Sequence, residues 1–281
     1  LLGRLHLEEA APLGDLPPPA RLILPTANQP SLLAFTSSGR VALLRWEFAG
    51  QQPGNLEKFL PDSLQGEQVV QVVPLPHPPE GSLGLLSSDG RFKRLPIEEF
   101  LELSGRAATV LKLKDGVILQ RVVVCREGEE LVVASSSGRL LRLAVNDTNL
   151  PVLGRVAQGP MLLRLLPGES VVGAACVTAE REVLLVSRTG RLKRLRVASL
   201  RSCQRGDLGQ IGLRLPDRGD RLVDICAETS AVVGVRLSGS DSRSLRLRPQ
   251  DISREDSEGP GLDLPLATGD AVRELVPLNL W

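Results

Sequence analysis

The sequence is poor in the side chains that many binding and catalytic sites use. It has no tyrosine, an aromatic content of 2%, two histidines and four cysteines. So few rings leave no set of aromatic platforms for stacking single-stranded nucleic acid. His6 and His77 lie far apart and no cysteines form a Cys-x-x-Cys pair, so no zinc site of familiar spacing can be assembled. We expect neither a metal nor a cofactor.

Catalytic motifs are missing as well. The chain has no G-x-x-x-x-G-K-[ST] phosphate loop, no G-x-G-x-x-G after a strand and no G-x-S-x-G. Its Asp and Glu residues stand mostly in turns, where solvation and turn geometry account for them. The sequence therefore predicts a binding module with no enzymatic site of its own.

Long apolar runs are also absent. None approaches the roughly 20 residues that a membrane-spanning helix needs. The chain opens at Leu1 without an initiator methionine. Its first residues lack the basic, apolar and small-residue regions that follow one another in a signal peptide. We expect a cytoplasmic protein with no membrane partner, present as a fragment or a processed form of a larger chain.

The formal net charge of +1 is too small for a strongly basic surface all round. The charges are unevenly distributed, however. Residues 187–205 hold seven basic side chains and no acidic one, whereas residues 251–274 hold seven acidic side chains against two arginines. One face can therefore be basic while the molecule as a whole stays nearly neutral.

One pattern recurs along the chain: an apolar run, a Ser- or Asp-rich turn ending in Gly, and then Arg followed by alternating apolar and basic residues. The turn glycines Gly39, Gly90, Gly138 and Gly190 lie about 50 residues apart, which is the spacing of propeller blades. The clear copies are residues 33–43, 85–95, 132–143 and 184–195, with a weaker copy at 233–247 and a half copy at 3–7.

Each copy predicts a β-hairpin, because short Val- and Leu-rich runs flank a glycine that supplies the positive φ of a tight turn. The strand after the turn alternates basic and apolar residues, so we expect one side to be buried and the other to present Arg or Lys. Helical periodicity is absent apart from a short stretch at 97–103.

A second element recurs between the hairpins, namely a Gly-containing turn followed by an apolar strand. Its copies are residues 115–118, 167–172, 218–223 and 268–272. The last copy has no hairpin after it and the half hairpin at 3–7 has no such strand before it. We therefore expect residues 1–281 to form a single domain of about six repeats, in which the N- and C-terminal segments complete one blade and remove the open sheet edges.

Three cysteines fall at the same place in successive repeats, at the end of the apolar strand. Cys125, Cys176 and Cys226 are about 50 residues apart, and we expect them to be small buried core residues. Cys203 is out of register with them and is expected to be a free thiol.

The repeated hairpin, seen best as Ser-Arg-Thr-Gly-Arg-Leu-Lys-Arg at 187–194, resembles the C-terminal domain of the A subunit of bacterial DNA gyrase and of its relative in topoisomerase IV. The resemblance covers nearly the whole chain. It implies an all-β, six-bladed β-pinwheel, a propeller-like disc of four-stranded antiparallel blades with a basic rim around which duplex DNA wraps.

The resemblance also implies the partners and the compartment. They are double-stranded DNA, the N-terminal catalytic core of the same polypeptide, and the ATPase B subunit of an ATP-dependent type IIA topoisomerase that promotes negative supercoiling at the nucleoid. The catalytic tyrosine of that enzyme lies in the separate core, which agrees with the absence of tyrosine here.

The gyrase signature is a seven-residue box, Gln-Arg-Arg-Gly-Gly-Lys-Gly, and its nearest match here is Gln-Arg-Gly-Asp-Leu-Gly-Gln at 204–210. By this resemblance Gln204, Arg205, Gly206 and Gly209 form a box-like loop. The second Arg and the Lys of the box are missing and Asp207 adds a negative charge. These departures are compatible both with a diverged gyrase and with a topoisomerase IV-like protein.

The basic residues of the hairpins are the candidates for contacts with DNA phosphate, which would be independent of sequence and strongly dependent on salt. The candidates are Arg40, Arg91, Lys93, Arg94, Arg139, Arg142, Arg188, Arg191, Lys193, Arg194, Arg243 and Arg246. The alternatives are a propeller that recognises a protein or small ligand through its loops, and a docking domain that has lost DNA binding.

Overall fold

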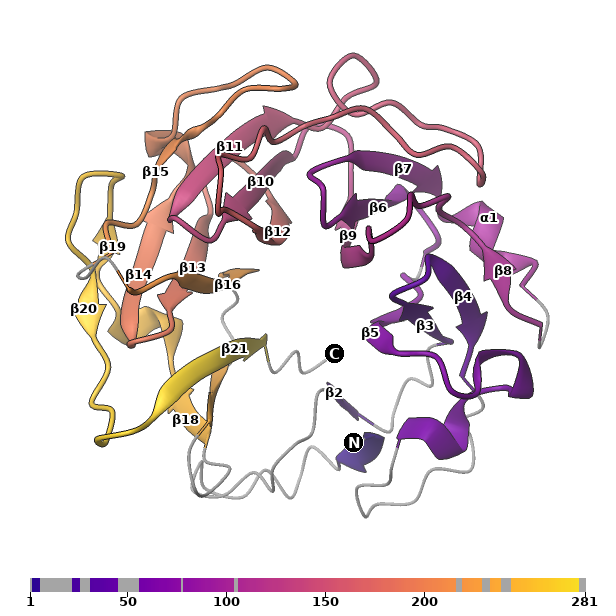
Figure 1. Cartoon of the computed structure of the whole chain (residues 1–281), viewed down its shortest axis with the longest axis horizontal. Helices are drawn as coiled ribbons and strands as arrows, with labels where there is room; N and C mark the ends of the chain where they lie inside the picture. Colours follow the sequence, from indigo (N-terminus) through magenta and orange to yellow (C-terminus); the bar gives the residue numbers. More distant parts are fainter. Residues whose placement is uncertain are drawn as a thin grey trace.

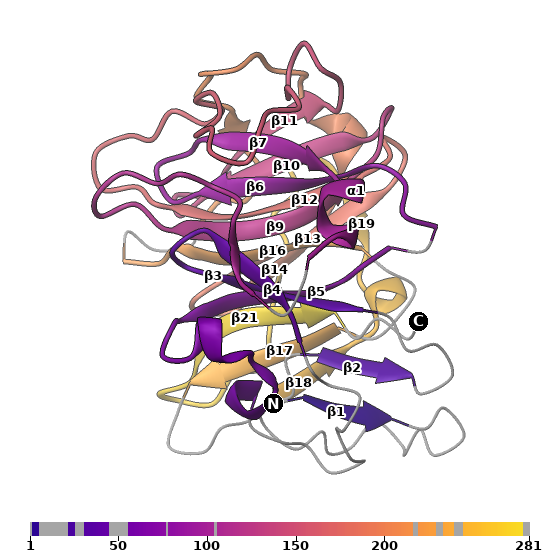
Figure 2. The same cartoon turned by 90° about the vertical axis from the view of Figure 1, so that its right-hand side faces the viewer.

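A computed structural model describes residues 2–5, 22–25, 31–44, 56–76, 78–103, 106–215, 219–228, 233–238 and 244–277. Its β-sheets stand side by side in a ring (Figure 1), and their strands run from one end of the ring to the other (Figure 2). The predicted all-β, propeller-like architecture is confirmed.

Five antiparallel hairpins occur at the five predicted places. They are β3 (Leu32–Thr36) with β4 (Arg40–Leu43), β6 (Ser82–Ser87) with β7 (Phe92–Pro96), β10 (Glu130–Ser135) with β11 (Arg139–Ala144), β13 (Glu182–Ser187) with β14 (Arg191–Arg196), and β17 (Val233–Ser238) with β18 (Ser244–Leu247). At Gly138 two separate features of the turn require a glycine. Its φ is 82°, and a Cβ there would lie 2.2 Å from the carbonyl oxygen of Leu213 in a neighbouring segment.

The second recurring element forms the strand that faces the centre of the ring (Figure 1). At the four predicted copies these inner strands are β9 (Leu119–Cys125), β12 (Val171–Val177), β16 (Leu222–Ala227) and β21 (Ala271–Pro277). A fifth inner strand, β5 (Val69–Pro74), was not predicted. Each pairs antiparallel with the first strand of the hairpin that precedes it in the sequence. A repeat is therefore a hairpin followed by its inner strand.

The remaining described strands at the N-terminus are β1 (Leu2–Leu5) and β2 (Leu22–Pro25), which pair in parallel. At the other end of the chain, β21 pairs with β17. Within the part of the chain that the structure describes, no strand pairing joins β1 or β2 to β21. Completion of one blade by both terminal segments stays a prediction.

Among the described residues, the outer strands of the first four hairpins, β4, β7, β11 and β14, are each covered by a segment that arrives from the next repeat. We call the described residues of 97–103 with 106–113, 146–165, 197–215 and 248–266 the bridging segments. They include β8 (Ala108–Thr109) on β4, β15 (Gln210–Ile211) on β11, and β19 (Arg254–Glu255) and β20 (Leu262–Asp263) on β14. They also include α1 (Glu98–Leu101), which confirms the predicted short helix, and the 3-10 turns η4 (Val197–Ser199) and η5 (Pro249–Asp251). Two further 3-10 turns, η2 (Leu56–Phe59) and η3 (Asp62–Leu64), precede β5.

The core lies between neighbouring sheets. For example, Val132 and Ala134 of β10 pack with Val183 and Leu185 of β13 in one buried cluster. Burial on both faces explains why the strands read as continuous apolar runs. Cys125 and Cys226 are buried and Cys176 is half-buried, as their places in the repeat predict, and Cys203 is also a buried free thiol. No helix among the described residues is long and apolar enough to cross a membrane.

Candidate nucleic-acid interface

The first arginine of each of the first four hairpins forms an ion pair within the protein. The side chain of Arg139 is buried and bridges Glu169, with its Nε 2.8 Å from a carboxylate oxygen, while another guanidinium nitrogen donates to the carbonyl of Leu208. Ser137 donates to the same carboxylate. The pairs at the equivalent positions are Arg40 with Glu67, Arg91 with Asp89 and Arg191 with Asp263.

The carboxylate of Glu169 shows how firmly this contact holds the turn. Burial alone would raise its pKa, but hydrogen bonds from Arg139, Ser137 and the backbone N–H of Leu166, together with the charge of Arg139, lower it to about 2. The hairpin turn and the turn before the inner strand are thereby joined by a charged contact.

The lysine of the hairpin is completely buried in two repeats. The Nζ of Lys93 donates to the carbonyl oxygens of Gly154 (2.8 Å) and Arg155 (2.6 Å). The Nζ of Lys193 donates to three carbonyl oxygens, at 2.7 to 2.9 Å. Burial lowers the pKa of both ammonium groups, that of Lys93 to about 8. These lysines hold the turns of the bridging segments against the outer strands.

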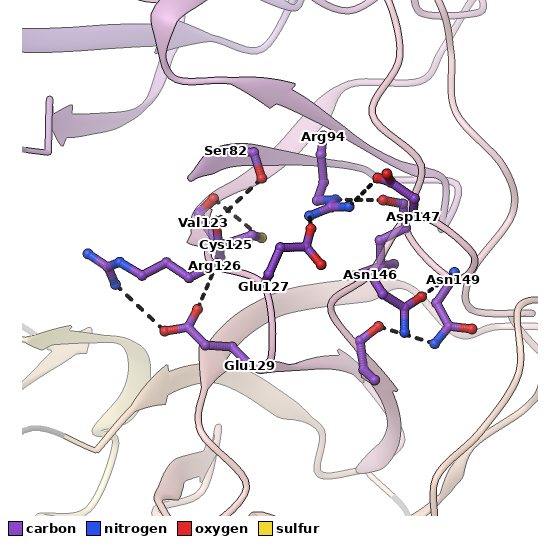
Figure 3. Close-up of polar contacts among 12 residues, drawn as sticks. Ser82, Arg94, Val123, Cys125, Arg126, Glu127, Glu129, Asn146, Asp147 and Asn149 are labelled. Carbon is purple, nitrogen blue, oxygen red and sulfur yellow. Dashed lines mark hydrogen bonds and ion pairs between the residues drawn. The ribbon is translucent and has the colours of Figure 1, made fainter. Parts of the chain in front are cut away.

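The arginine that follows each lysine is also held inside. In Figure 3 the guanidinium of Arg94 points toward Glu127 and Asp147, at 2.6 and 2.7 Å, and its Nε donates to the carbonyl of Leu150. Arg194 contacts Glu182 and Glu228 in the same manner at 3.3 and 3.2 Å. In a third repeat the corresponding residue, Arg142, makes two contacts of 3.1 Å with Glu130.

The prediction that the strand after each turn exposes its basic side is therefore wrong for β7 and β14. Lys93, Arg94, Lys193 and Arg194 are all buried, because the bridging segments cover the face that the alternation would leave to solvent. Arg188, in the turn before β14, is exposed and has no side-chain partner among the described residues. Arg243 and the side chain of Arg246 lie outside the described part.

Other basic side chains are exposed at regular intervals. The hairpin turns and the turns before the inner strands lie together at one end of the sheets, as the hydrogen bond from Ser136 N to Ser170 O (2.9 Å) shows. At this turn end each bridging segment bonds to a hairpin glycine, and three of the four segments then present a basic residue, whereas the fourth has Pro265 there. These exposed residues are Lys112, Arg164 and Arg214, at equivalent positions in three successive repeats.

The two ends of the ring differ in charge. At the turn end, exposed Lys112, Lys114, Arg164, Arg188, Arg214 and Arg221 outnumber exposed Asp115, Glu258 and Asp263. The opposite end holds α1, η4 and η5, and we call it the helix end. There the exposed acids include Glu80, Glu98, Glu99, Glu102, Glu127, Asp147, Glu180, Asp251 and Asp256, against Arg126, Arg181, Arg196, Arg248 and Arg254. Only the turn end favours a polyanion.

Known proteins share both the sequence pattern and the fold. The family model described as "DNA gyrase C-terminal domain, beta-propeller" matches residues 85–126, 129–178 and 181–225, and each match covers all or most of one hairpin and its inner strand. The A subunit of DNA topoisomerase 4 from Synechocystis sp. is 30% identical over 221 residues, which are 74% of this chain and 24% of that protein. The A subunit of DNA gyrase from Ureaplasma parvum is 28% identical over 239 residues, covering 82% and 28%. The chain thus spans about a quarter of these relatives.

Solved structures agree on the fold. A DNA gyrase A C-terminal domain superposes with a TM-score of 0.75 at 19% identity, covering 91% of this chain and 85% of that one. The C-terminal domain of a topoisomerase IV gives 0.73 at 16% identity, covering 88% and 78%. The chain belongs to the DNA gyrase C-terminal domain family.

The box-like loop of this family member is a turn that recurs in the bridging segments. Gly209 has a φ of 72° and lies where a Cβ would be 2.2 Å from the carbonyl of Leu140, and Gly159 lies equally close to Phe92 in the preceding segment. Asp207 accepts a hydrogen bond from the backbone of Gln204, so it closes the turn. Gln204 and Arg205 are exposed, and Gly206 has a φ of 81°.

Sequence analysis missed the regular basic positions at the turn end, although a signal exists. The triplets Leu-Lys-Leu at 111–113, Leu-Arg-Leu at 163–165 and Leu-Arg-Leu at 213–215 recur about 50 residues apart. The first leucine of each triplet bonds to a hairpin glycine through its backbone N–H. These triplets therefore carry exposed charge, whereas the hairpins carry buried charge.

Proposed function

We propose that this domain binds duplex DNA without reading its sequence, as the non-catalytic C-terminal domain of a type IIA topoisomerase A subunit. Membership of the gyrase C-terminal domain family supports the proposal. The observation that carries it is the recurrence of an exposed basic side chain at equivalent positions of the turn end in three successive repeats, namely Lys112, Arg164 and Arg214. A polymer of evenly spaced phosphates is a natural partner for evenly spaced cations on a ring.

The contacts would be electrostatic. Lys112 and Arg164 have no side-chain partner among the described residues, so their charges are free for phosphate. Arg214 is 2.6 Å from Glu258, but both side chains are largely exposed, and an exposed pair of this kind contributes little. Exchange of Glu258 for a phosphate oxygen costs little, and each phosphate bound releases condensed counterions.

The candidates from the hairpins enter this proposal unequally. Arg188 and Arg205 are exposed without partners among the described residues and join the DNA-binding surface. The lysines and arginines buried under the bridging segments have the different role of holding those segments in place. Arg40, Arg91 and Arg191 are only partly exposed and their charges are offset, so they contribute less to the contact with DNA.

Beyond DNA binding, the proposal includes wrapping of the duplex around the ring, as a gyrase-like domain that promotes negative supercoiling. The partners would be the N-terminal catalytic core of the same polypeptide and the ATPase B subunit, in the cytoplasm at the nucleoid. The degenerate box-like loop, in which Asp207 takes part in the turn, is equally consistent with a topoisomerase IV-like protein.

Binding of a labelled linear duplex tests the proposal. We expect two unrelated duplexes of about 150 base pairs to bind with similar affinity at low salt, with log Kd rising linearly with log salt concentration. Relaxed plasmid that is nicked and religated with the domain bound should change its linking number. Absence of binding at low salt, or binding that salt does not weaken, would contradict the proposal.

A second candidate function, recognition of a protein or small ligand, is favoured by one observation. An open depression of about 510 Å³ lies beside the turn end, and its lining combines the apolar side chains of Ile211, Leu213 and Leu215 with Arg214 and Glu258. Ile211 is 43% exposed there. Failure to bind DNA would favour this alternative.

A further inference from the structure

The inner strands share an irregularity that places one residue of each repeat at an equivalent position. In every one of the five sheets, the pairing of the inner strand with the hairpin shifts register at the same point. The inner-strand residues paired just before that shift are Gln71, Arg121, Gly173, Asp224 and Glu274. Because the inner strands face the centre of the ring (Figure 1), this position forms a belt around the hub.

One side chain of this belt reaches past its neighbour. The guanidinium of Arg121, on β9, forms a hydrogen-bonded ion pair with Asp224, on β16, although β12 stands between these two strands around the ring. It passes directly over Gly173 of β12, where a Cβ would lie 2.8 Å from one terminal nitrogen and 2.9 Å from Nε. The glycine at this place in the belt is what leaves room for the arginine.

Asp224, the acid that pairs with Arg121, also contacts a fourth sheet, the one that contains β21. The carboxylate of Asp224 is buried and accepts the backbone N–H of Leu275, on β21, at 2.8 Å, and that of its own neighbour Ile225 at 2.8 Å. The contacts therefore run from β9 across β12 to β16 and on to β21. The sequence separation between Arg121 and Asp224 is 103 residues, whereas the hairpins and inner strands pair within one repeat.

Two other inner-strand side chains, those of Gln71 and Gln120, contact the adjacent sheet. Gln71 exchanges two hydrogen bonds with the backbone of Val122, at 2.8 and 2.9 Å, and Gln120 donates to the carbonyl of Val172 at 3.3 Å. Such neighbour-to-neighbour contacts allow small changes of angle to accumulate around a ring. A contact that skips one sheet restrains the sum of the two successive angles between neighbouring sheets. A contact between adjacent sheets restrains only one of these angles.

We propose that Arg121, Gly173 and Asp224 form a hub clamp that fixes the relative orientation of four successive sheets and thereby the path of the wrapped DNA. This inference rests on the proposed function for its DNA readout, but the clamp itself is a property of the ring. The clamp residues are positioning residues. They lie on the inner strands, which face the centre of the ring, and they change the shape of the track without touching phosphate.

The test compares variants that open the clamp with one that should not. Gly173→Ala displaces the guanidinium while it keeps every charge, Arg121→Met removes the charge while it keeps most of the volume, and Asp224→Asn removes the acceptor charge. Gly219→Ala is the matched control, because a Cβ there meets nothing within 4 Å. Each protein is assayed for duplex affinity over a salt series and for the linking-number change per bound domain on relaxed plasmid.

With the clamp open, we expect the linking-number change per bound domain to fall and the radius of gyration in solution scattering to rise, while the salt slope of binding stays at its wild-type value. The Gly219→Ala protein should match wild type in all three. In addition, Arg121→Met combined with Asp224→Asn should lose no more wrapping than either single change, because both remove the same contact.

Three results would overturn the clamp. They are wild-type wrapping and radius of gyration in Gly173→Ala, strictly additive losses in the double variant, and an equal fall in salt slope and wrapping, which would indicate general damage. If a charge-removing variant does not fold, the test rests on Gly173→Ala and on hydrogen exchange of the Leu275 amide in the wild-type protein. The clamp requires that amide to be protected from exchange as strongly as the amides of the strand core. If the wild-type protein binds no DNA, the proposed function is contradicted. The comparison of the radius of gyration between wild type and the clamp variants would still test the clamp.

Discussion

Neutralising the three regular cations of the turn end should remove a measurable part of the salt dependence of DNA binding. The variant replaces Lys112, Arg164 and Arg214 by Gln, which keeps their size and exposure. Each phosphate contact contributes about 0.9 to the slope of log affinity against log salt, so loss of three contacts lowers the slope by about 2.7. Between about 50 and about 200 mM salt, wild type should then lose about 40-fold more affinity than the variant.

A matched control separates this site from general electrostatic attraction. Arg126, Arg181 and Arg196 are exposed at the helix end among acidic side chains, and their replacement by Gln removes the same net charge. Fluorescence anisotropy of a labelled duplex, titrated at four or more salt concentrations, gives both slopes. The reasoning would be refuted by equal slopes in the two triple variants, or by a larger loss in the helix-end variant.

The other expectations concern the buried charges. In wild type, the free energy of unfolding should fall as the pH drops from about 4.5 toward about 2, because Glu169 keeps its charge in the folded state down to a pKa of about 2. Glu169→Gln should flatten this pH dependence. In urea unfolding near neutral pH, it should lower the free energy of unfolding by about 3 kcal/mol. Lys193→Met leaves three carbonyl oxygens without their donor and should cost on the order of 3 kcal/mol, with faster proteolysis at residues 254–262 as the readout. Asp89→Ser removes the acid that faces Arg91 and should lower the free energy of unfolding by about 1 kcal/mol. Adding Val117→Glu places an acid where other repeats have one and should restore the wild-type unfolding midpoint.

The architecture could be predicted from the sequence because local chemistry determines it. A positive-φ glycine between two apolar runs allows little besides a hairpin, and Gly39, Gly90, Gly138 and Gly190 all have the expected φ. The regular interval between them then identifies a repeat fold. The inner strands could be located in the same way, but not their partners, since the sequence alone does not say whether an apolar strand joins the hairpin before it or the one after it.

The candidate site was harder to predict because alternation along one strand does not reveal what covers that strand. Lys93 and Arg94 follow the pattern of an exposed basic strand, yet a bridging segment that begins about 50 residues later in the sequence lies over them. The same holds for the hub, where the contact between Arg121 and Asp224 joins residues whose separation gives no local signal.

A repeated arginine is therefore evidence of a DNA contact only when no acid repeats in register with it. Arg139 is followed 30 residues later by Glu169, and Arg40 is followed 27 residues later by Glu67, each acid standing directly after a glycine that opens the turn before an inner strand. In these two repeats the unit that supplies the charge also supplies its partner, and in the other two described repeats Asp89 and Asp263 offset the charges of Arg91 and Arg191. The cations in the Leu-Lys-Leu and Leu-Arg-Leu triplets have no acid repeating in register, since Glu258 faces Arg214 alone. Their charge accumulates over three successive repeats, which is the property that the proposed wrapping surface requires.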